Sequence, residues 1–185
     1  MSQKYDSLKE TTVSSTEHYR NSFLRLTEDE VILPDGKTST RVVVHHPGGV
    51  NLIALDDQQR LILVEQFRYP VGGALMETPA GKCEPGEENI LTAARELEEE
   101  TGYRAKNLKS IGSFTTAPGF SNEIIENFLA TGLTIAADAL KGDDDEFLNL
   151  FFVTKEEAWD WVKDGKIMDY KTIYAIQYLT IEGLW

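Results

Sequence analysis

An acidic segment from Gly81 to Tyr103 constrains the fold of this chain more than any other feature. Its sequence predicts a turn and then a helix over residues 88–101, with Gly102 as a left-handed residue that ends the helix. Such a helix needs an apolar face that packs against the rest of a domain. The residues that we expect to supply this face are Leu91, Ala94 and Leu97.

Three carboxylates lie on one side of this expected helix. A helix advances about 100° per residue, so residues three and four positions apart share a face. Glu96 therefore lies beside both Glu99 and Glu100. The three like charges repel one another, and a hard divalent cation would remove that repulsion, since Mg²⁺ binds carboxylates together with substrate phosphates. The spacing favours a metal site for phosphate chemistry over a merely solvated acidic surface.

The whole segment matches a pattern of glycines, glutamates and one arginine at fixed distances. The matching residues are Gly81, Glu87, Arg95, Glu96, Leu97, Glu99, Glu100 and Gly102. This pattern resembles the Nudix box, from which only Tyr103 departs, because it is aromatic where an aliphatic residue is usual. The resemblance implies an α+β fold, an α/β/α sandwich with a central mixed sheet, and hydrolysis of a phosphoanhydride bond with Mg²⁺, or alternatively Mn²⁺. Within the box we expect Glu87 and Arg95 to pair and to hold the turn against the helix.

Composition argues against several other classes of function. The net charge of −13 disfavours nucleic acid as a partner, because a nucleic-acid backbone requires a basic surface. No apolar run approaches the roughly 20 residues that span a bilayer, so we expect no membrane association. Residues 1–6 lack the apolar stretch of a signal peptide, and Cys83 is the single cysteine. These features predict a cytoplasmic protein.

The remaining sequence predicts two domains, residues 1–46 and 47–185. The first would contain a polar tail without regular structure up to about residue 14 and a small antiparallel β-sheet within residues 19–44. The second would be the Nudix domain. Its expected strands cover residues 50–55, 61–67, 75–77, 110–116, 124–131 and 147–153, and its later helices cover residues 155–164 and 169–181.

Four motifs outside the box, at residues 65–70, 77–81, 116–123 and 171–176, narrow the resemblance. Together with Pro118 they resemble the ADP-ribose pyrophosphatase branch of the Nudix family. The implied substrate is ADP-ribose or a related nucleoside diphosphate sugar, cleaved to a nucleoside monophosphate and a sugar phosphate. The same motifs recur in GDP-mannose hydrolases and other nucleotide-sugar hydrolases. GDP-mannose is therefore an alternative substrate, and the removal of damaged nucleotides is a second alternative.

The expected metal ligands lie on the helix and just before the box. Glu96 and Glu100, one helical turn apart, are the leading ligands. Glu99 is a third ligand or an acceptor beside the ligands, and we count it among the catalytic candidates. The resemblance adds the backbone carbonyl of Ala80, which precedes the box glycine.

The same resemblance assigns substrate-binding residues outside the box. Arg68 would contact the diphosphate or the distal sugar, and Arg41 would bind substrate from the N-terminal sheet. Glu77 and Glu123 would line the pocket and hold polar groups of the ribose or the base. The alternative for each is a structural role, such as the cover of an edge strand by Arg68 or a solvated loop carboxylate at Glu123.

An acidic run at residues 143–146 is the candidate source of the catalytic base. Four acids after a glycine usually form a solvated loop, but the resemblance implies a glutamate on a loop at this place that acts as the base. Glu146 has the longest reach and is the first candidate, followed by Asp145 and then Asp144.

The N-terminal sheet predicts a homodimer. Residues 19–44 provide too few strands to bury a core alone, because isolated hairpins are only marginally stable. Their apolar residues, which need a cover, are Phe23, Leu24, Leu26, Val31, Ile32 and Leu33. Relatives in the branch that the chain resembles exchange this sheet across a two-fold axis, which would bring residues 19–41 close to the partner's substrate.

A non-enzymatic protein is the competing class. A catalytically inactive Nudix domain could sense a nucleotide and regulate another protein, but the intact Glu96, Glu99 and Glu100 argue against it. A protein that only buffers metal would need the box but neither Pro118 nor Arg68. The sequence therefore favours an enzyme.

Overall fold

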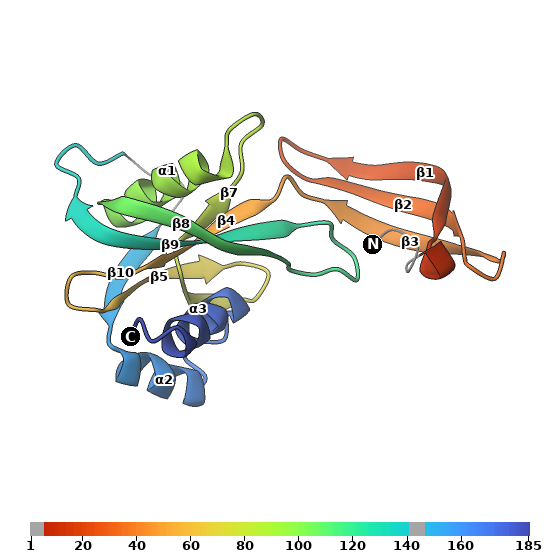
Figure 1. The fold of residues 1–185 in the computed structure, drawn as a ribbon. Coiled ribbons are helices and arrows are strands. Elements are labelled where there is room, and N and C mark those ends of the chain that lie inside the picture. The colour runs from red at the N-terminus through yellow and green to blue at the C-terminus, as the bar shows by residue number, and fades with distance from the viewer. Residues whose placement is uncertain (1–5, 141–146) are drawn as a thin grey trace. The chain divides into compact units, whose positions relative to one another are not determined.

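The computed structural model describes residues 6–140 and 147–185, which form two compact units. The first unit holds the described residues up to Gly48 together with Phe114–Ile124. The second unit holds Gly49–Ser113 and Ile125–Trp185, apart from residues 141–146. Figure 1 shows the ribbon of both units, coloured along the chain. No helix within the described residues combines the length and the apolar character that crossing a membrane requires.

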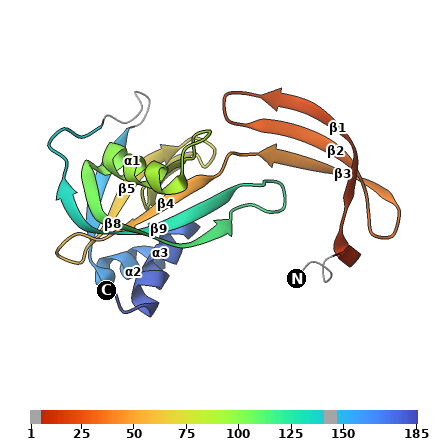
Figure 2. The ribbon, with the colours of Figure 1, turned by 45° about the horizontal axis from the view of Figure 1, so that its top comes forward.

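Three antiparallel strands make up most of the first unit, in the order β1-β2-β3 (Figure 2). They are β1 (Thr11–Arg20), β2 (Arg25–Ile32) and β3 (Thr38–His45), and the short 3-10 helix η2 (Asp6–Leu8) precedes them. The expectation of an irregular tail up to residue 14 is wrong from Thr11 onward. The reason is that the β-branched residues at the start of β1 pair with the end of β2, with Thr11 opposite Ile32.

The segment Phe114–Ile124 belongs to this first unit because it is bonded to the end of β3. The backbone N–H of Val44 donates to the carbonyl of Phe120 at 2.7 Å. The hydroxyl of Ser121 donates in return to the carbonyl of Val44 at 3.1 Å. These bonds fix the turn around Pro118 next to the last residues of the small sheet.

Two sheets form the centre of the second unit. The larger has the order β7-β4-β9-β8 and the smaller has the order β10-β5-β6. Their strands are β4 (Gly49–Ala54), β5 (Leu61–Arg68), β6 (Gly73–Glu77), β7 (Ala80–Lys82), β8 (Tyr103–Thr115), β9 (Ile124–Ile135) and β10 (Leu148–Val153). Strand β4 runs parallel to β9 and antiparallel to β7, so the larger sheet is mixed.

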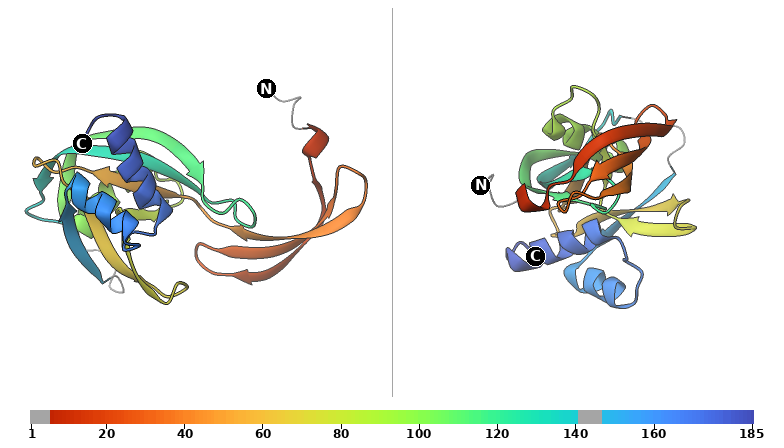
Figure 3. Two further views of the ribbon diagram at one scale, coloured as in Figure 1. Left: turned by 90° about the horizontal axis from the view of Figure 1, so that it is seen from below. Right: turned by 90° about the vertical axis from the view of Figure 1, so that its right-hand side faces the viewer.

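Helices cover the strands of this unit on two sides. Helix α1 (Asn89–Thr101) lies on one side, and α2 (Lys155–Lys163) and α3 (Tyr170–Ile181) lie on the other (Figures 1 and 3). Alternate residues of the fully buried strand β4 supply both cores, because successive side chains of a strand point to opposite faces. Leu52 packs with Leu97 of α1, and Ile53 packs with Ile176 of α3. The predicted α+β fold, with sheets between helices, is confirmed.

The buried face of α1 differs from the expected one. Leu97 is fully buried as predicted, but Leu91 and Ala94 are exposed, and Ala93 takes their place in the core. Ala93 and Leu97 are one turn apart, so they share the face that meets the larger sheet. The helix ends as expected at Gly102, which has a φ of 73° and donates its N–H to the carbonyl of Glu98.

Candidate active site

Gly81 and Glu96 meet at the junction of β7 and α1. Gly81 pairs with Val50 of β4, and a Cβ atom at its position would lie only 1.8 Å from the carboxyl carbon of Glu96. The Glu96 side chain is therefore packed directly against the glycine backbone. This close approach explains why the box requires a residue without a side chain at that position.

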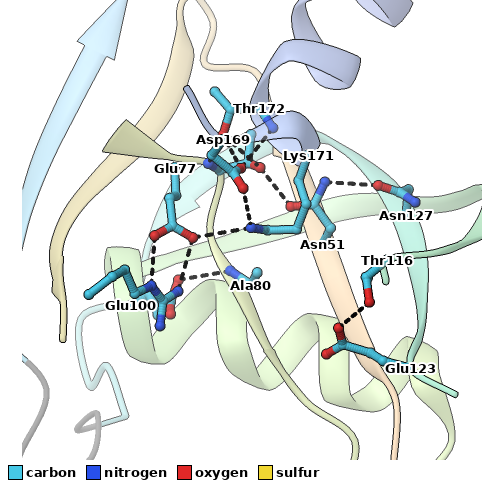
Figure 4. A network of polar contacts seen from close by, with 12 residues as sticks. Asn51, Glu77, Ala80, Glu100, Thr116, Glu123, Asn127, Asp169, Lys171 and Thr172 are labelled. Atoms are coloured by element: carbon cyan, nitrogen blue, oxygen red, sulfur yellow. Dashed lines mark hydrogen bonds and ion pairs between the residues drawn. The ribbon is translucent and has the colours of Figure 1, made fainter. Parts of the chain in front are cut away.

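Ala80 and Glu100 meet one residue earlier on the same strand. The backbone N–H of Ala80 donates to Oε2 of Glu100 at 3.0 Å (Figure 4). The structure thus brings together three of the predicted metal ligands, because Ala80 and Gly81 are adjacent and receive the Glu100 and Glu96 side chains of α1.

Arg95 lies among the glutamates of the box. Its Nη1 donates to Oε1 of Glu96 at 2.9 Å and to Oε2 of Glu99 at 2.7 Å, and its Nη2 donates to Oε2 of Glu87 at 3.2 Å. The expected pair of Glu87 and Arg95 is confirmed. Desolvation disfavours the charge of Arg95, but the surrounding carboxylates outweigh it and raise the pKa of Arg95. The guanidinium thus offsets part of the negative charge of Glu96 and Glu99, two of the three carboxylates that the like-charge argument identified.

The chemistry of this group fits a hard cation. Carboxylate and carbonyl oxygens are the ligands that Mg²⁺ prefers, and Glu96, Glu99 and Glu100 supply them. Among residues 6–140 and 147–185, however, no three His, Cys, Asp or Glu side chains are gathered closely enough to hold a metal ion. The carboxylates are engaged by Arg95 and by the Ala80 backbone. The ligand assignment therefore stays a prediction.

Arg68 and Glu77 form a bidentate ion pair between the ends of β5 and β6. The Nε and Nη2 atoms of Arg68 donate to the two oxygens of Glu77 at 2.7 and 3.0 Å. Glu77 is buried, with 4% of its side chain exposed, whereas 41% of the Arg68 side chain is exposed. The bond to Glu77 raises the pKa of Arg68, and the nearby charge of Glu100 raises it further. A substrate-binding candidate is therefore close to a metal-binding candidate.

Lys171 and Asp169 complete this cluster, and the sequence reasoning assigned neither a role. Lys171 Nζ donates to Oε2 of Glu77 at 3.1 Å and to Oδ1 of Asp169 at 2.7 Å (Figure 4). A signal was available in the sequence. Lys171 is the second residue of α3, and a cation in the first turn of a helix is disfavoured by the helix dipole. Such a lysine needs a specific anionic partner.

Two other predicted substrate residues belong to the first unit. Arg41 Nε donates to Oε2 of Glu10 at 2.9 Å within the small sheet. Glu123 accepts a hydrogen bond from the Thr116 hydroxyl, and its Oε1 lies 3.2 Å from Nδ1 of His46. Sequence reasoning missed His46, because the contact joins residues that are far apart along the chain.

The candidate bases Asp144, Asp145 and Glu146 lie outside the described residues. The chain just before them is anchored to α1, because the backbone N–H of Leu140 donates to Oε1 of Glu98 at 3.1 Å. Glu98 also accepts two hydrogen bonds from Arg104, both at 2.7 Å. Glu98 is therefore a buried structural residue, unlike the exposed acid of a solvated helix face.

Comparisons with known proteins give the same picture for nearly the whole chain. A family model of the Nudix domain matches residues 45–175, and a model of the nucleoside diphosphate sugar hydrolase N-terminal domain matches residues 10–44. An ADP-ribose pyrophosphatase from Bacillus subtilis (strain 168) is 44% identical over 176 residues, which cover 95% of each chain. The methanol dehydrogenase activator of Bacillus methanolicus is 41% identical over 174 residues, which cover 94% of each chain.

Solved structures support the fold. A crystal structure of an ADP compounds hydrolase superposes with a TM-score of 0.81 and 20% identity, over 95% of this chain and 96% of the other. The family model of the Nudix domain matches most of the chain. The matched residues include both pairs that meet at the β7–α1 junction, Gly81 with Glu96 and Ala80 with Glu100. This chain therefore belongs to the Nudix hydrolase family.

Proposed function

We propose that this enzyme hydrolyses the diphosphate bond of ADP-ribose or a related nucleoside diphosphate sugar. The products would be a nucleoside monophosphate and a sugar phosphate. The observation that carries the proposal is that one short segment holds both kinds of group. Glu77 binds the half-exposed guanidinium of Arg68, and Ala80, three residues later, binds Glu100 of α1. A diphosphate needs both neutralising cations and a metal. The 44% identity to an ADP-ribose pyrophosphatase supports the choice of substrate.

We assign Mg²⁺ to Glu96, Glu100 and the carbonyl of Ala80, with Glu99 as a third ligand or a neighbouring acceptor. Mn²⁺ would be an alternative ion for the same oxygen ligands. A bound ion of this kind supplies charge neutralisation and an activated water molecule. The protein's own part is to hold the carboxylates, which the backbone of β7 does at Gly81 and Ala80.

Arg68 would bind the diphosphate, since its planar guanidinium can donate two parallel hydrogen bonds to phosphate oxygens. Before a substrate binds, Glu77 would hold Arg68 in place, because Glu77 is buried and accepts hydrogen bonds from Nε and Nη2 of Arg68. We assign further substrate contacts to Arg41 and Glu123 of the first unit. We assign the general base to Glu146, with Asp145 and Asp144 as the next candidates.

A substrate panel tests this function. We expect ADP-ribose or another nucleoside diphosphate sugar to be cleaved at least about 100-fold more efficiently than dATP or 8-oxo-dGTP, because a site built around one ligand's polar groups rejects others strongly. Removal of divalent ions with EDTA should abolish turnover, and Mg²⁺ should restore it. Mass spectrometry of the products identifies the bond that is cleaved. A preference for dATP or 8-oxo-dGTP would favour the removal of damaged nucleotides as the function. A preference for GDP-mannose would keep the reaction but replace ADP-ribose as the assigned substrate.

We also propose that residues 1–46 form a separate domain through which two chains associate as a homodimer. We place the enzyme in the cytoplasm. Apolar side chains of the small sheet and of the turn between β1 and β2 support an interface, since Phe23, Ile32 and Val42 are 40%, 41% and 52% exposed. Val31, by contrast, is already buried. Light scattering should give the mass of a dimer at micromolar concentration. A truncated chain that starts at Val44 should be monomeric with a raised KM. A full-length monomer, or a truncated chain with an unchanged KM, would contradict the proposal.

A further inference from the structure

Four charged side chains of alternating sign form a continuous line in the second unit. Arg68 contacts Glu77, Glu77 contacts Lys171, and Lys171 contacts Asp169, with donor–acceptor distances between 2.7 and 3.1 Å. The exposed side-chain fractions are 41% for Arg68, 4% for Glu77, 12% for Lys171 and 9% for Asp169. Only the Arg68 end of the line is open enough to meet a ligand.

The buried end of this line is fixed to the scaffold. Asp169 caps α3 by accepting the backbone N–H of Thr172 at 3.0 Å, and the Thr172 hydroxyl also donates to Asp169. Thr172 accepts the backbone N–H of Thr78 at 2.8 Å, directly after Glu77. The Thr78 hydroxyl donates in turn to Asn51 of β4 at 2.6 Å. These buried bonds hold Lys171 and Glu77 at a fixed distance from each other.

Lys171 is the second cation in contact with the buried carboxylate of Glu77, beside Arg68. Burial disfavours the charged form of Glu77, but the bonds from Arg68 and the charge of Lys171 outweigh it and lower the pKa of Glu77. A buried carboxylate that loses its last cation is strongly destabilised. With Arg68 as its sole cation, Glu77 would therefore retain the guanidinium and compete with a phosphate for it.

We propose that Lys171 is a positioning residue: it keeps Glu77 compensated and in place, so that Arg68 can turn from Glu77 to the diphosphate of the substrate. This inference rests on the proposed function, because it takes the substrate to be a diphosphate ester. It adds a residue that touches neither the substrate nor the metal and that acts through Glu77.

The first test is a pair of substitutions at Lys171. We expect Lys171→Met to raise the KM for ADP-ribose at least about tenfold with a smaller change in kcat, because the lost interaction concerns ligand binding. Lys171→Arg keeps the charge and should return KM to within about threefold of the wild type. Lys171→Gln, which keeps a hydrogen-bond donor, serves if the Met variant does not fold. Lys163→Met is the matched control, since Lys163 forms an exposed pair with Asp160.

The second test removes the charge that Lys171 is proposed to compensate. If Arg68 is trapped by Glu77 in Lys171→Met, then adding Glu77→Gln should release it, and the double variant should have a lower KM than Lys171→Met alone. A purely structural role for Lys171 would give effects that add. A double variant with a KM equal to or higher than that of Lys171→Met overturns the inference.

Binding of ADP separates this inference from the proposed function. It is measured by calorimetry on the wild type, on Lys171→Met, on Glu77→Gln and on the double variant. A wild type that neither binds ADP nor cleaves any nucleoside diphosphate sugar would overturn both. A wild type that is active on nucleotide sugars, with additive effects of Lys171→Met and Glu77→Gln on KM and on ADP affinity, would overturn the inference alone. Rescue by Glu77→Gln in both measurements supports it.

Discussion

The Glu100→Gln variant is expected to fold normally and to lose about two to three orders of magnitude in kcat, the loss typical of removing one preorganised electrostatic group from an active site. The amide oxygen of Gln can still accept the hydrogen bond that the Ala80 N–H gives to Glu100. The shape of the β7–α1 junction should therefore stay the same while the charge disappears. Steady-state kinetics at saturating and at limiting Mg²⁺, with thermal unfolding of both proteins, measure the two effects separately.

Glu88→Gln is the matched control for this variant. Glu88 precedes the same helix, is exposed, and makes no capping hydrogen bond through its side chain, so the same charge is removed at a position without an assigned role. Its kcat should stay close to that of the wild type. Near-normal turnover of Glu100→Gln at limiting Mg²⁺ would show that Glu100 is not a metal ligand.

The features of the site that could be predicted are those encoded by local spacing. The helix that carries Glu96, Glu99 and Glu100 and its end at Gly102 follow from a period of 3.6 residues and from one glycine. The buried face of the same helix could not be derived in this way. Leu91 is more apolar than Ala93, yet Ala93 is buried, because the approach of the larger sheet selects the face that is covered.

Contacts between distant residues were beyond the sequence reasoning. Lys171 and Glu77 are 94 positions apart, and their contact exists only because α3 begins next to the end of β6. Strand β7 was missed for a different reason, since Ala80–Lys82 is too short to show any periodicity. Its neighbour β4 is what makes it a strand, through the pairing of Gly81 with Val50. Both gaps concern tertiary context, which a single sequence does not contain.

Gly81→Ala is expected to abolish most activity while the protein still folds. The new Cβ atom would lie 1.8 Å from the carboxyl carbon and 2.1 and 2.3 Å from the two oxygens of Glu96, so the carboxylate must move away. The moving group is the end of a flexible side chain, so the cost in stability should be modest. A displaced ligand costs far more in catalysis, and we expect kcat to fall about 100-fold or more, as for other active-site groups misplaced by about 1 Å.

Two comparisons tie this loss to the contact with Glu96. Gly73→Ala changes a glycine that has no atom within 4 Å of its potential Cβ and no positive φ, so its kcat should equal that of the wild type. In a Glu96→Ala background the collision partner is absent, so Gly81→Ala should lower the melting temperature less there than in the wild type. Equal effects of Gly81→Ala in both backgrounds, or a wild-type kcat for Gly81→Ala, would contradict the packing of Glu96 on Gly81. A smaller effect in the Glu96→Ala background would mean that the box glycine is needed to leave room for one carboxylate.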